Sequence, residues 1–367
     1  MSLIVGVFSP AINWCGGAEW VAVNIIDALK ENGHQVIVLS DSPLNQSKFQ
    51  HIFNKKVHVD QQVVFPLRFF SPTNYHNVYT DSIRSLLLKS KCKVLIDTFS
   101  NALLPGVDCC YIHYPLLKRM ENRLPYMRNK IFFHPYKSYL RLRKNKIKSL
   151  FFANSRFSAE AIRAEIGVVP HVLYPSVSNE IFKHSEIMES KQRPNTVLTI
   201  ARICPQKRLE IIPQIAELTS KEISFTIVGL LDSKRTLKLL LKTADELGVS
   251  ERVKIMTNVR KDQLIQMLLK SKAYLHTSIE EHFGISIVEA MAAGCIPIVH
   301  NSGGPKEFVP SNQRFNTIYE AADIVEKSID SWSPARAKKF AEVAERFSEK
   351  NFRKQFIDIF HSHFLRR

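Results

Sequence analysis

The chain has 367 residues, a formal net charge of +17, and 45% hydrophobic against 23% charged residues. This composition excludes an intrinsically disordered chain, and the length suits two domains better than one hydrophobic core. The six cysteines form no CxxC pair, so the sequence supports neither a zinc site nor a disulfide framework. The amino terminus lacks a basic leader, and no apolar run approaches the ~18 residues that span a bilayer. We therefore expect a cytoplasmic, peripherally membrane-associated protein.

The first half of the chain alternates between strand and helix patterns. A helix pattern from Ala18 to Glu31 follows the first apolar run, and Gly33 stands where a helix-terminating glycine belongs. Residues 41–80 are rich in Asn, Ser, Pro and His and read as irregular connections. The predicted strands are Leu3–Phe8, Gln35–Leu39, Val94–Ile96, Cys109–His113 and Leu150–Ala153.

The second half repeats this alternation after a polar segment, Tyr174–Asn195, that reads as a linker between domains. Helices are predicted at Arg208–Thr219 and Ser233–Leu247, and residues 334–367 look helical and amphipathic. The predicted strands are Thr196–Ala201, Ser224–Val228, Val253–Met256, Ala273–His276 and Ile296–Val299.

This pattern predicts an α/β protein with two Rossmann-like parallel-sheet domains that face each other across a cleft. We expect an N-terminal domain over 1–180, a C-terminal domain over 181–335, and C-terminal helices over 336–367 that pack back on the N-terminal domain. Ligands of such folds bind outside the carboxyl ends of the strands.

A basic stretch between Lys118 and Lys148 holds eleven Lys or Arg residues against one acid, Glu121, and so carries +10 of the net charge. Aromatic residues are interleaved with these charges, which suits contact with an anionic membrane surface. We predict that Arg141, Arg143 and Lys144 make this contact. A solvated basic face with its aromatic residues in the core, and a nucleic-acid site, are the alternatives.

Two loops that follow predicted strands carry features suited to phosphate groups. Gly16 and Gly17 lie between the first strand and the first helix, where a helix N-terminus favours an anion, although ordinary turns also use such pairs. Arg202 and Lys207 flank another such loop, and fixed cations can stabilise a diphosphate leaving group without a metal. The dinucleotide pattern GxGxxG is absent.

The segment EEHFGISIVEAMAAGCIPIVHNSGG at 280–304 combines a Phe-Gly turn, a helix, a strand and a second glycine turn. Its carboxylates Glu281 and Glu289 can act as a general acid and base or as hydrogen-bond acceptors for sugar hydroxyls. His113 ends the strand in YIHYP, where it can hydrogen-bond a substrate or cap a loop. The chain has no D-x-D pair of the kind that holds a divalent metal on a diphosphate.

Together these motifs resemble the retaining GT-B glycosyltransferases of the GT4 (glycogen-synthase-like) group. EHFGISIVE fits the E-x7-E signature, and CGGAE, YIHYP, ARICPQK and HNSGG match further landmarks in the same order. The sequences of these motifs are most similar to those of Alg11-type α-1,2-mannosyltransferases, although this chain is much shorter than the eukaryotic enzymes of that type.

The resemblance implies roles for the matching residues. Arg202 and Lys207 would bind the donor diphosphate together with Gly16 and Gly17. Glu281 would contact the donor sugar, Glu289 the nucleotide ribose, and backbone amides around Phe283 and Gly284 the sugar or phosphate. His113 would lie beside the transferred sugar, so His113 and Glu281 are the candidate catalytic residues, and the loop Asn301–Gly304 would line the pocket.

We therefore predict a retaining, metal-independent glycosyltransferase that needs no cofactor beyond a nucleotide-sugar co-substrate. The expected reaction transfers mannose from GDP-mannose to a lipid-linked glycan or glycolipid acceptor at an anionic membrane surface. A UDP-sugar donor carrying glucose or N-acetylglucosamine is the alternative within this fold, as are an epimerase or a phosphorylase. A basic nucleic-acid-binding protein is the alternative from another class, although no nucleic acid is expected as a partner.

Overall fold

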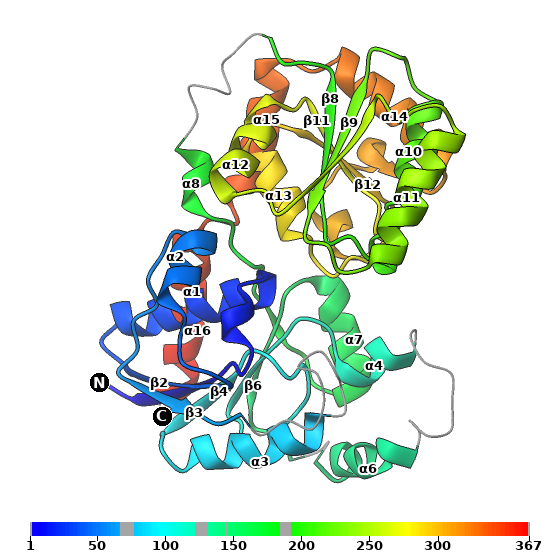
Figure 1. Cartoon of the computed structure of the whole chain (residues 1–367). Helices are drawn as coiled ribbons and strands as arrows, with labels where there is room; N and C mark the ends of the chain where they lie inside the picture. Colours follow the sequence, from blue (N-terminus) through cyan, green and yellow to red (C-terminus); the bar gives the residue numbers. More distant parts are fainter. Residues whose placement is uncertain (1, 67–76, 122–130, 144–145, 184–191, 366–367) are drawn as a thin grey trace. The chain divides into compact units, whose positions relative to one another are not determined.

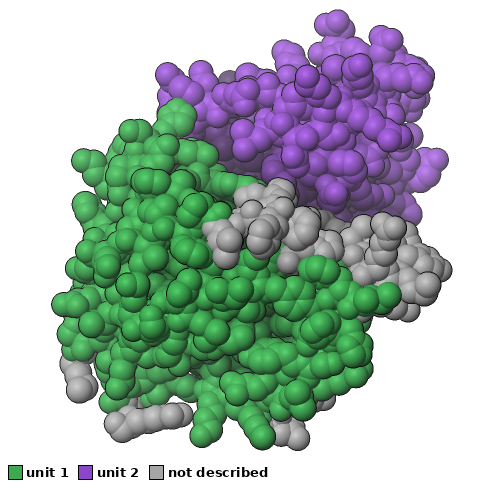
Figure 2. All heavy atoms as spheres, turned by 60° about the horizontal axis from the view of Figure 1, so that its bottom comes forward, with its two compact units in different colours: residues 1–176, 349–367 green, residues 177–348 purple. Residues whose placement is uncertain are grey.

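The computed structural model describes residues 2–66, 77–121, 131–143, 146–183 and 192–365. The chain forms two compact units: unit 1 comprises residues 1–176 and 349–367, and unit 2 comprises residues 177–348 (Figure 2). These limits differ from the expected boundaries at 180 and 335. The expected linker divides at Ser176–Val177, and its residues 184–191 lie outside the described ranges.

Unit 1 contains a parallel sheet with the strand order β3-β2-β1-β4-β5-β6-β7 over its described residues (Figure 1). The strands are β1 (Ile4–Phe8), β2 (Gln35–Ser40), β3 (Gln61–Val64), β4 (Val94–Asp97), β5 (Cys109–Ile112), β6 (Leu150–Ala153) and β7 (His171–Val172). The helices are η1 (Ile12–Trp14), α1 (Gly17–Glu31), α2 (Gln46–Phe53), α3 (Val78–Lys89), α4 (Leu116–Glu121), α6 (His134–Arg143), α7 (Arg156–Ile166) and α16 (Glu349–Phe364).

Unit 2 contains a second parallel sheet, with the order β10-β9-β8-β11-β12-β13 over its described residues. Its strands are β8 (Thr196–Ile200), β9 (Ser224–Gly229), β10 (Val253–Thr257), β11 (Ala273–His276), β12 (Ile296–His300) and β13 (Arg314–Phe315). Its helices are α8 (Asn179–Phe182), η3 (Pro205–Lys207), α10 (Ile211–Glu217), α11 (Lys234–Glu246), α12 (Lys261–Lys270), α13 (Ile285–Ala292), η4 (Gly304–Glu307), η5 (Ser311–Gln313), α14 (Ile318–Asp330) and α15 (Pro334–Glu345). Helices cover both faces of this sheet: α12, α13 and α15 lie on one side and α10, α11 and α14 on the other (Figure 1).

The expectation of two Rossmann-like parallel-sheet domains is confirmed, and each predicted strand is present within a residue of its expected ends. The prediction that residues 41–80 are irregular is wrong, because α2 and β3 lie there. β3 is a partly exposed edge strand with the polar start Gln61-Gln62, so it lacks the apolar run that marks a buried strand. α2 begins after Asn45, whose side chain accepts a hydrogen bond from the Lys48 N–H.

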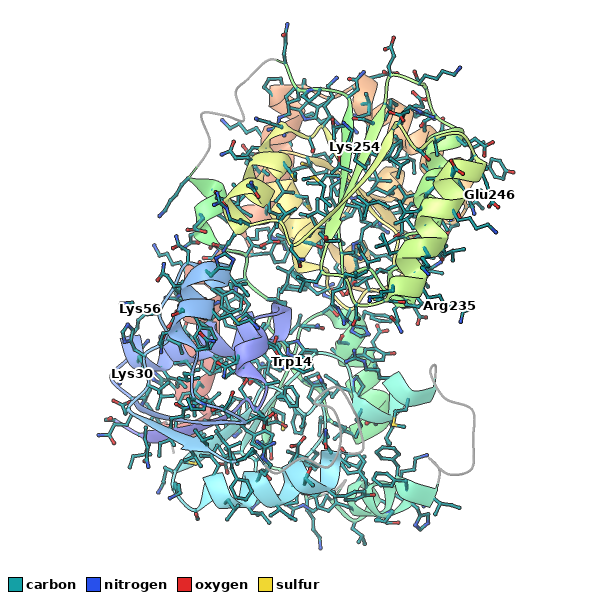
Figure 3. All side chains as sticks on the ribbon, in the orientation of Figure 1. Trp14, Lys30, Lys56, Arg235, Glu246 and Lys254 are labelled. Carbon is teal, nitrogen blue, oxygen red and sulfur yellow. The ribbon has the colours of Figure 1, made fainter. Side chains whose placement is uncertain are left out.

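Apolar side chains fill the space between each sheet and its helices, while charged residues such as Lys56, Glu246 and Lys254 lie on the outside (Figure 3). In unit 1 the core includes Phe133 and Tyr136, which belong to the basic stretch. The Tyr136 hydroxyl accepts a hydrogen bond from the Leu103 N–H at 2.9 Å. These aromatic rings are therefore core residues, as the alternative reading of the basic stretch proposed.

The predicted C-terminal helices divide between the units. α15 belongs to unit 2 and packs against α13, so the expectation that it joins the N-terminal domain is wrong. α16 packs against α1 in unit 1, as expected. The reason lies in the residues between α15 and α16. Phe347 completes an aromatic cluster with Phe283 and Phe308 in unit 2, whereas Glu349 pairs with Lys55 and Arg353 pairs with Asp27 and Glu31 of α1, all in unit 1.

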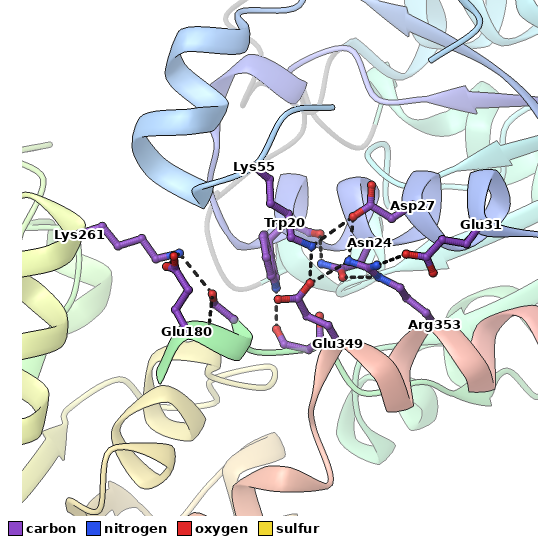
Figure 4. A network of polar contacts seen from close by, with 11 residues as sticks. Trp20, Asn24, Asp27, Glu31, Lys55, Glu180, Lys261, Glu349 and Arg353 are labelled. Carbon is purple, nitrogen blue, oxygen red and sulfur yellow. Dashed lines mark hydrogen bonds and ion pairs between the residues drawn. The ribbon is translucent and has the colours of Figure 1, made fainter. Parts of the chain in front are cut away.

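A network of charged side chains holds α16 on α1 (Figure 4). The Arg353 guanidinium donates to Asp27 and Glu349, each at 2.8 Å, and also to Glu31. Lys55 pairs with Asp27 at 3.2 Å and with Glu349, so both carboxylates have two cationic partners. Because Arg353 is largely buried, this network attaches the last segment of the chain more firmly than exposed ion pairs do.

We expect Arg353→Met to loosen α16 without unfolding the rest of unit 1. Loss of hydrogen bonds to charged groups costs roughly 1.5–3 kcal/mol, and Lys55 still compensates two of the three carboxylates. Hydrogen exchange of the α1 and α16 amides should accelerate accordingly. The matched control is Lys327→Met, which removes an exposed ion pair with Asp323 one helical turn away in α14. Equal effects of the two variants would show that the network does not hold α16.

Candidate active site in unit 2

The residues singled out in the second half of the sequence lie at the carboxyl edge of the unit 2 sheet. Lys207 ends η3 in the loop that follows β8, and Glu281 follows β11 by five residues. The loop Asn301–Gly304 follows β12. Because parallel strands all end at the same edge, residues about 100 positions apart in the chain come together there.

Lys207 and Glu281 form the centre of the site. The Lys207 Nζ lies 2.6 Å from Glu281 Oε2, and the same oxygen lies 3.0 Å from His276 Nε2. The Glu281 Oε1 accepts a hydrogen bond from the His282 N–H at 3.2 Å. The backbone carbonyl of Lys207 in turn accepts from the Thr277 hydroxyl at 2.5 Å, which ties the two loops together.

The surroundings of Glu281 favour its ionised form. Burial opposes ionisation, but the positive charge of Lys207 and the hydrogen bond from His276 outweigh it and hold the pKa of Glu281 well below its usual range. Burial lowers the pKa of His276, although its bond to Glu281 acts in the other direction. The site therefore holds a carboxylate, an ammonium and a neutral imidazole.

A close approach of two backbone segments fixes the position of Glu281. Gly303 has a φ of +72°, and a Cβ on it would lie 2.2 Å from the Glu281 carbonyl oxygen. The Gly304 N–H donates to that carbonyl at 2.8 Å. Ser302 accepts a hydrogen bond from the Glu280 N–H at 2.7 Å. The loop Asn301–Gly304 therefore packs directly against the backbone of the Glu281 loop. This close approach requires a residue without a side chain at position 303.

Arg202 and Glu289 lie at the same edge but outside the Lys207–Glu281 contact. Arg202 is half exposed and pairs with Asp232, which follows β9, at 3.1 Å. Glu289 is in α13, and burial raises its pKa against the opposing charge of Lys261. Lys261 itself pairs with Glu180 at 3.3 Å (Figure 4). Within the described residues the Glu289 carboxylate makes no hydrogen bond, so it is available to a hydroxyl-bearing ligand.

In the Phe-Gly turn at the start of α13, the Phe283 side chain packs inside unit 2, and the backbone is the part that can contact a ligand. The Phe283 ring is buried against Phe308 and Phe347, with ring centroids 5.3 and 5.4 Å away. Gly284 has a φ of +91° and precedes the first turn of α13. Phe283 therefore anchors the turn through its ring, and only backbone groups there can face a ligand.

The candidate residues of unit 1 lie at the carboxyl edge of its own sheet. The Gly16 N–H is already bonded to Glu19 Oε2 at 2.8 Å in a helix cap, so it acts within the fold. Gly17 is the first residue of α1. His113 follows β5; burial lowers the pKa of its ring to about 4, and its Nε2 is buried without a partner among the described residues. His113 is therefore a neutral imidazole with one free ring nitrogen.

The predicted membrane-contact residues lie at the end of α6. Arg141 and Arg143 are exposed, as is Leu142 between them, whose exposed fraction is 76%. Lys144 lies outside the described residues. No helix in the described ranges is both long and apolar enough to cross a bilayer.

Sequence reasoning missed His276, which shares the Glu281 oxygen with Lys207. The signal was the position of His276 as the last residue of a predicted strand, five residues before Glu281. It was overlooked because a histidine in an apolar run most often packs in a core.

Both halves of the chain match known protein families. Residues 15–180 match the family described as Glycosyltransferase Family 4, and residues 180–351 match Glycosyl transferases group 1. The chain belongs to the GT-B glycosyltransferases of the GT4 group. The resemblance drawn from the motifs is confirmed, and Arg202, Lys207, Glu281 and Glu289 all lie within the group 1 match.

Relatives and solved structures with similar chains are also glycosyltransferases. A GDP-Man:Man(3)GlcNAc(2)-PP-Dol alpha-1,2-mannosyltransferase of Dictyostelium discoideum is 25% identical over 68% of this chain and 57% of its own length. The Homo sapiens protein of that name is 24% identical over 83% of this chain and 73% of its own length. The fold is similar to Anabaena Alr3699/HepE in complex with UDP and glucose, with a TM-score of 0.72 and 17% identity over 98% of this chain and 100% of that one.

We expect Gly303→Ala to displace the Glu281 loop, because the added Cβ would overlap the Glu281 backbone. Gly248→Ala is the matched control: Gly248 also has a positive φ, +65°, but a Cβ there meets no atom within 4 Å. Both variants carry a backbone strain of about 1–2 kcal/mol, so the difference in Tm isolates the overlap. Gly303→Ala should show the lower Tm, and equal values would remove the support that we assign to this loop.

Proposed function

We propose that this protein is a retaining, metal-independent glycosyltransferase that transfers a hexose from a nucleotide sugar. The observation that carries this proposal is the contact between Lys207 and Glu281 at the carboxyl edge of the unit 2 sheet. A nucleotide sugar presents a diphosphate, which is complementary to an ammonium, and hydroxyl groups, which are complementary to a carboxylate. The two side chains stand side by side as the two parts of such a donor require.

Two cations in the loop after β8 are suited to the leaving group. When the bond to the anomeric carbon breaks, negative charge develops on the diphosphate, and positioned cations stabilise that charge. Lys207 provides a compact charge beside the sugar site, and Arg202 provides a planar set of donors nearby in the chain. This role needs no divalent metal, which is why we propose metal independence.

The two carboxylates are proposed to hold the sugar and the ribose. Glu281 is ionised, and its Oε1 accepts only one weak bond from the protein among the described residues, so it can also accept from a sugar hydroxyl. Glu289 accepts no hydrogen bond from the part of the chain that the structure describes, and it is proposed to accept from the ribose hydroxyls. We assign neither residue as a nucleophile, and the proposed retention follows a same-face displacement in which the departing phosphate assists the incoming hydroxyl.

In unit 1, His113 is proposed to accept a hydrogen bond from the transferred sugar through its unpartnered Nε2. A ring with a pKa of about 4 is neutral at physiological pH, so this nitrogen carries a free electron pair. Gly17 is proposed to approach the diphosphate, whereas the amide of Gly16 is already bonded to Glu19.

GDP-mannose is our first candidate donor, and an UDP-sugar is the second. Relatives of 24–25% identity carry names that specify GDP-mannose and a dolichol-linked glycan. Alr3699/HepE, similar in fold, binds UDP and glucose. By the same names, the acceptor that we propose is a lipid-linked glycan or glycolipid.

A thermal-shift series with GDP, UDP and their mannose and glucose forms tests the donor. At a hundredfold excess over Kd a ligand adds about 2.7 kcal/mol, which raises the Tm of a unit of this size by about 5 °C or more. GDP and GDP-mannose should give the larger shift. Lys207→Gln should abolish it, while Lys254→Gln, at an exposed position on β10, should preserve it. No shift with any nucleotide sugar, and no transfer to lipid acceptors, would refute the proposed function.

We propose that the end of α6 brings the protein to an anionic membrane. Arg141 and Arg143 flank the exposed Leu142, so two charges can meet lipid headgroups while an apolar side chain enters the interface. Phe133 and Tyr136 of the basic stretch are core residues, and Phe132 and Tyr139 are partly buried against that core. The proposed membrane-contact surface therefore comprises the end of α6 and not the whole basic stretch 118–148.

Sedimentation with liposomes that contain anionic lipid tests this surface. We expect Arg141→Glu with Arg143→Glu to reduce binding strongly, and wild-type binding to fall steeply with salt. Lys338→Glu with Lys339→Glu is the control, since it changes the net charge equally at exposed positions in α15 of unit 2. Equal losses in both double variants would mean that net charge alone, and not α6, attracts the membrane.

A further inference from the structure

We infer that His276 is a positioning residue that keeps Glu281 aimed at the transferred sugar once Lys207 engages the donor diphosphate. This role rests on the proposed function, because it requires a donor with both a diphosphate and a sugar. The inference comes from the position, the hydrogen bonds and the burial of the His276 ring.

The His276 ring is held rigidly by the strand that carries it. His276 is the last residue of β11 and is 3% exposed. Its ring stacks on that of Tyr274, with centroids 6.4 Å apart and an angle of 20° between planes. The Tyr274 hydroxyl is itself tied to the Ser286 hydroxyl at 2.8 Å and to the Ile200 carbonyl at 3.1 Å. The ring therefore cannot follow Glu281 if the carboxylate moves.

The hydrogen bonds assign the ring a single tautomer. Glu281 is ionised and can only accept, so the proton between the two groups belongs to His276 Nε2. The His276 Nδ1 is buried and has no partner among the described residues. A second proton there would be an unpaired buried donor, so the ring stays neutral and donates one bond, to Glu281 Oε2.

Lys207 cannot fix the orientation of the Glu281 carboxylate throughout the reaction, as His276 can. Its ammonium is attached to a flexible stem, and its Nζ lies 2.6 Å from Glu281 Oε2. A bound diphosphate offers a stronger anion to that ammonium. As Lys207 turns to the phosphates, the His276 bond remains on the same oxygen and the His282 N–H remains on the other.

The result is a carboxylate of fixed orientation with free electron pairs for a sugar hydroxyl. Without His276, Glu281 would follow Lys207 toward the phosphates or rotate away from the sugar. The loss should therefore be felt in the transfer of the sugar more than in the binding of a nucleoside diphosphate, which contacts the cations. His276 itself touches neither ligand in this arrangement.

The test compares His276→Gln with His276→Asn. The glutamine amide reaches the position of Nε2 and can donate to Glu281, whereas the shorter asparagine amide overlaps Nδ1 and cannot. Both side chains are polar and of similar size, so they differ chiefly in that bond. We expect His276→Asn to lower kcat/KM for the nucleotide sugar about 10- to 100-fold, the range for one hydrogen bond to a charged group. His276→Gln should recover most of this loss, and both variants should bind GDP or UDP within about threefold of wild type.

The outcomes separate this role from the proposed function. A wild-type protein that binds no nucleoside diphosphate and transfers no sugar overturns the proposed function and this role with it. An active wild type whose two variants retain full activity overturns this role alone. Equal losses in both variants, or a loss confined to nucleoside diphosphate binding, likewise overturn it.

A spectroscopic readout is independent of the donor. Imidazole ¹⁵N NMR of the donor-free protein should show His276 as the neutral tautomer protonated at Nε2, and this signal should persist when GDP or UDP is added. Protonation at Nδ1, or exchange between tautomers on adding the nucleotide, would contradict the bond to Glu281 on which the inference depends.

Discussion

The site depends on the compensation of one carboxylate that is largely withdrawn from water. A buried charge is costly unless cations and hydrogen bonds replace its hydration. Glu281 receives an ammonium from the loop after β8, an imidazole N–H from the end of β11 and a backbone N–H from its own loop. Its backbone is supported by the loop after β12. Three strand ends are therefore joined through a single residue.

The strand order explains why these three ends are neighbours. The unit 2 sheet runs β10-β9-β8-β11-β12-β13, so the chain builds outward from β8 in one direction and then continues from β11 in the other. The helices α10 and α13, which follow β8 and β11, lie on opposite faces of the sheet, and folds of this kind bind ligands at the carboxyl edge where the strand order reverses. Lys207 comes from the first of these strands and Glu281 from the second. The sheet thus brings a cation and a carboxylate to the place where such folds bind ligands.

The sequence was sufficient for the central strands of both sheets, which have a local signal, but not for β3, β7 and β13. The candidate site residues also have a local signal, and their roles stay predictions. Buried parallel strands are short apolar runs, and Glu281 and Glu289 follow a specific spacing around a Phe-Gly turn. The missed features depend on tertiary contacts. His276 looked like a strand residue until its bond to Glu281 was seen, and the Gly16 amide looked free until Glu19 was found to cap it. The aromatic residues of the basic stretch have a helical spacing that fits a core and a membrane face equally well, and Phe133 and Tyr136 proved to be core residues.

The pairing of Lys207 with Glu281 also bears on how a chain with a net charge of +17 can select its ligand. Such a chain attracts many anions, and an unpaired Lys207 would bind them with little discrimination. Because Lys207 is paired with Glu281, an anion that takes the ammonium leaves a buried carboxylate with less compensation. Inorganic phosphate offers nothing in return at neutral pH beyond weak donors. A nucleotide sugar replaces the ammonium with hydroxyl donors on the same molecule, so only a ligand with both groups satisfies both side chains. In the proposed function, the pairing of Lys207 with Glu281 therefore favours the complete donor over its fragments.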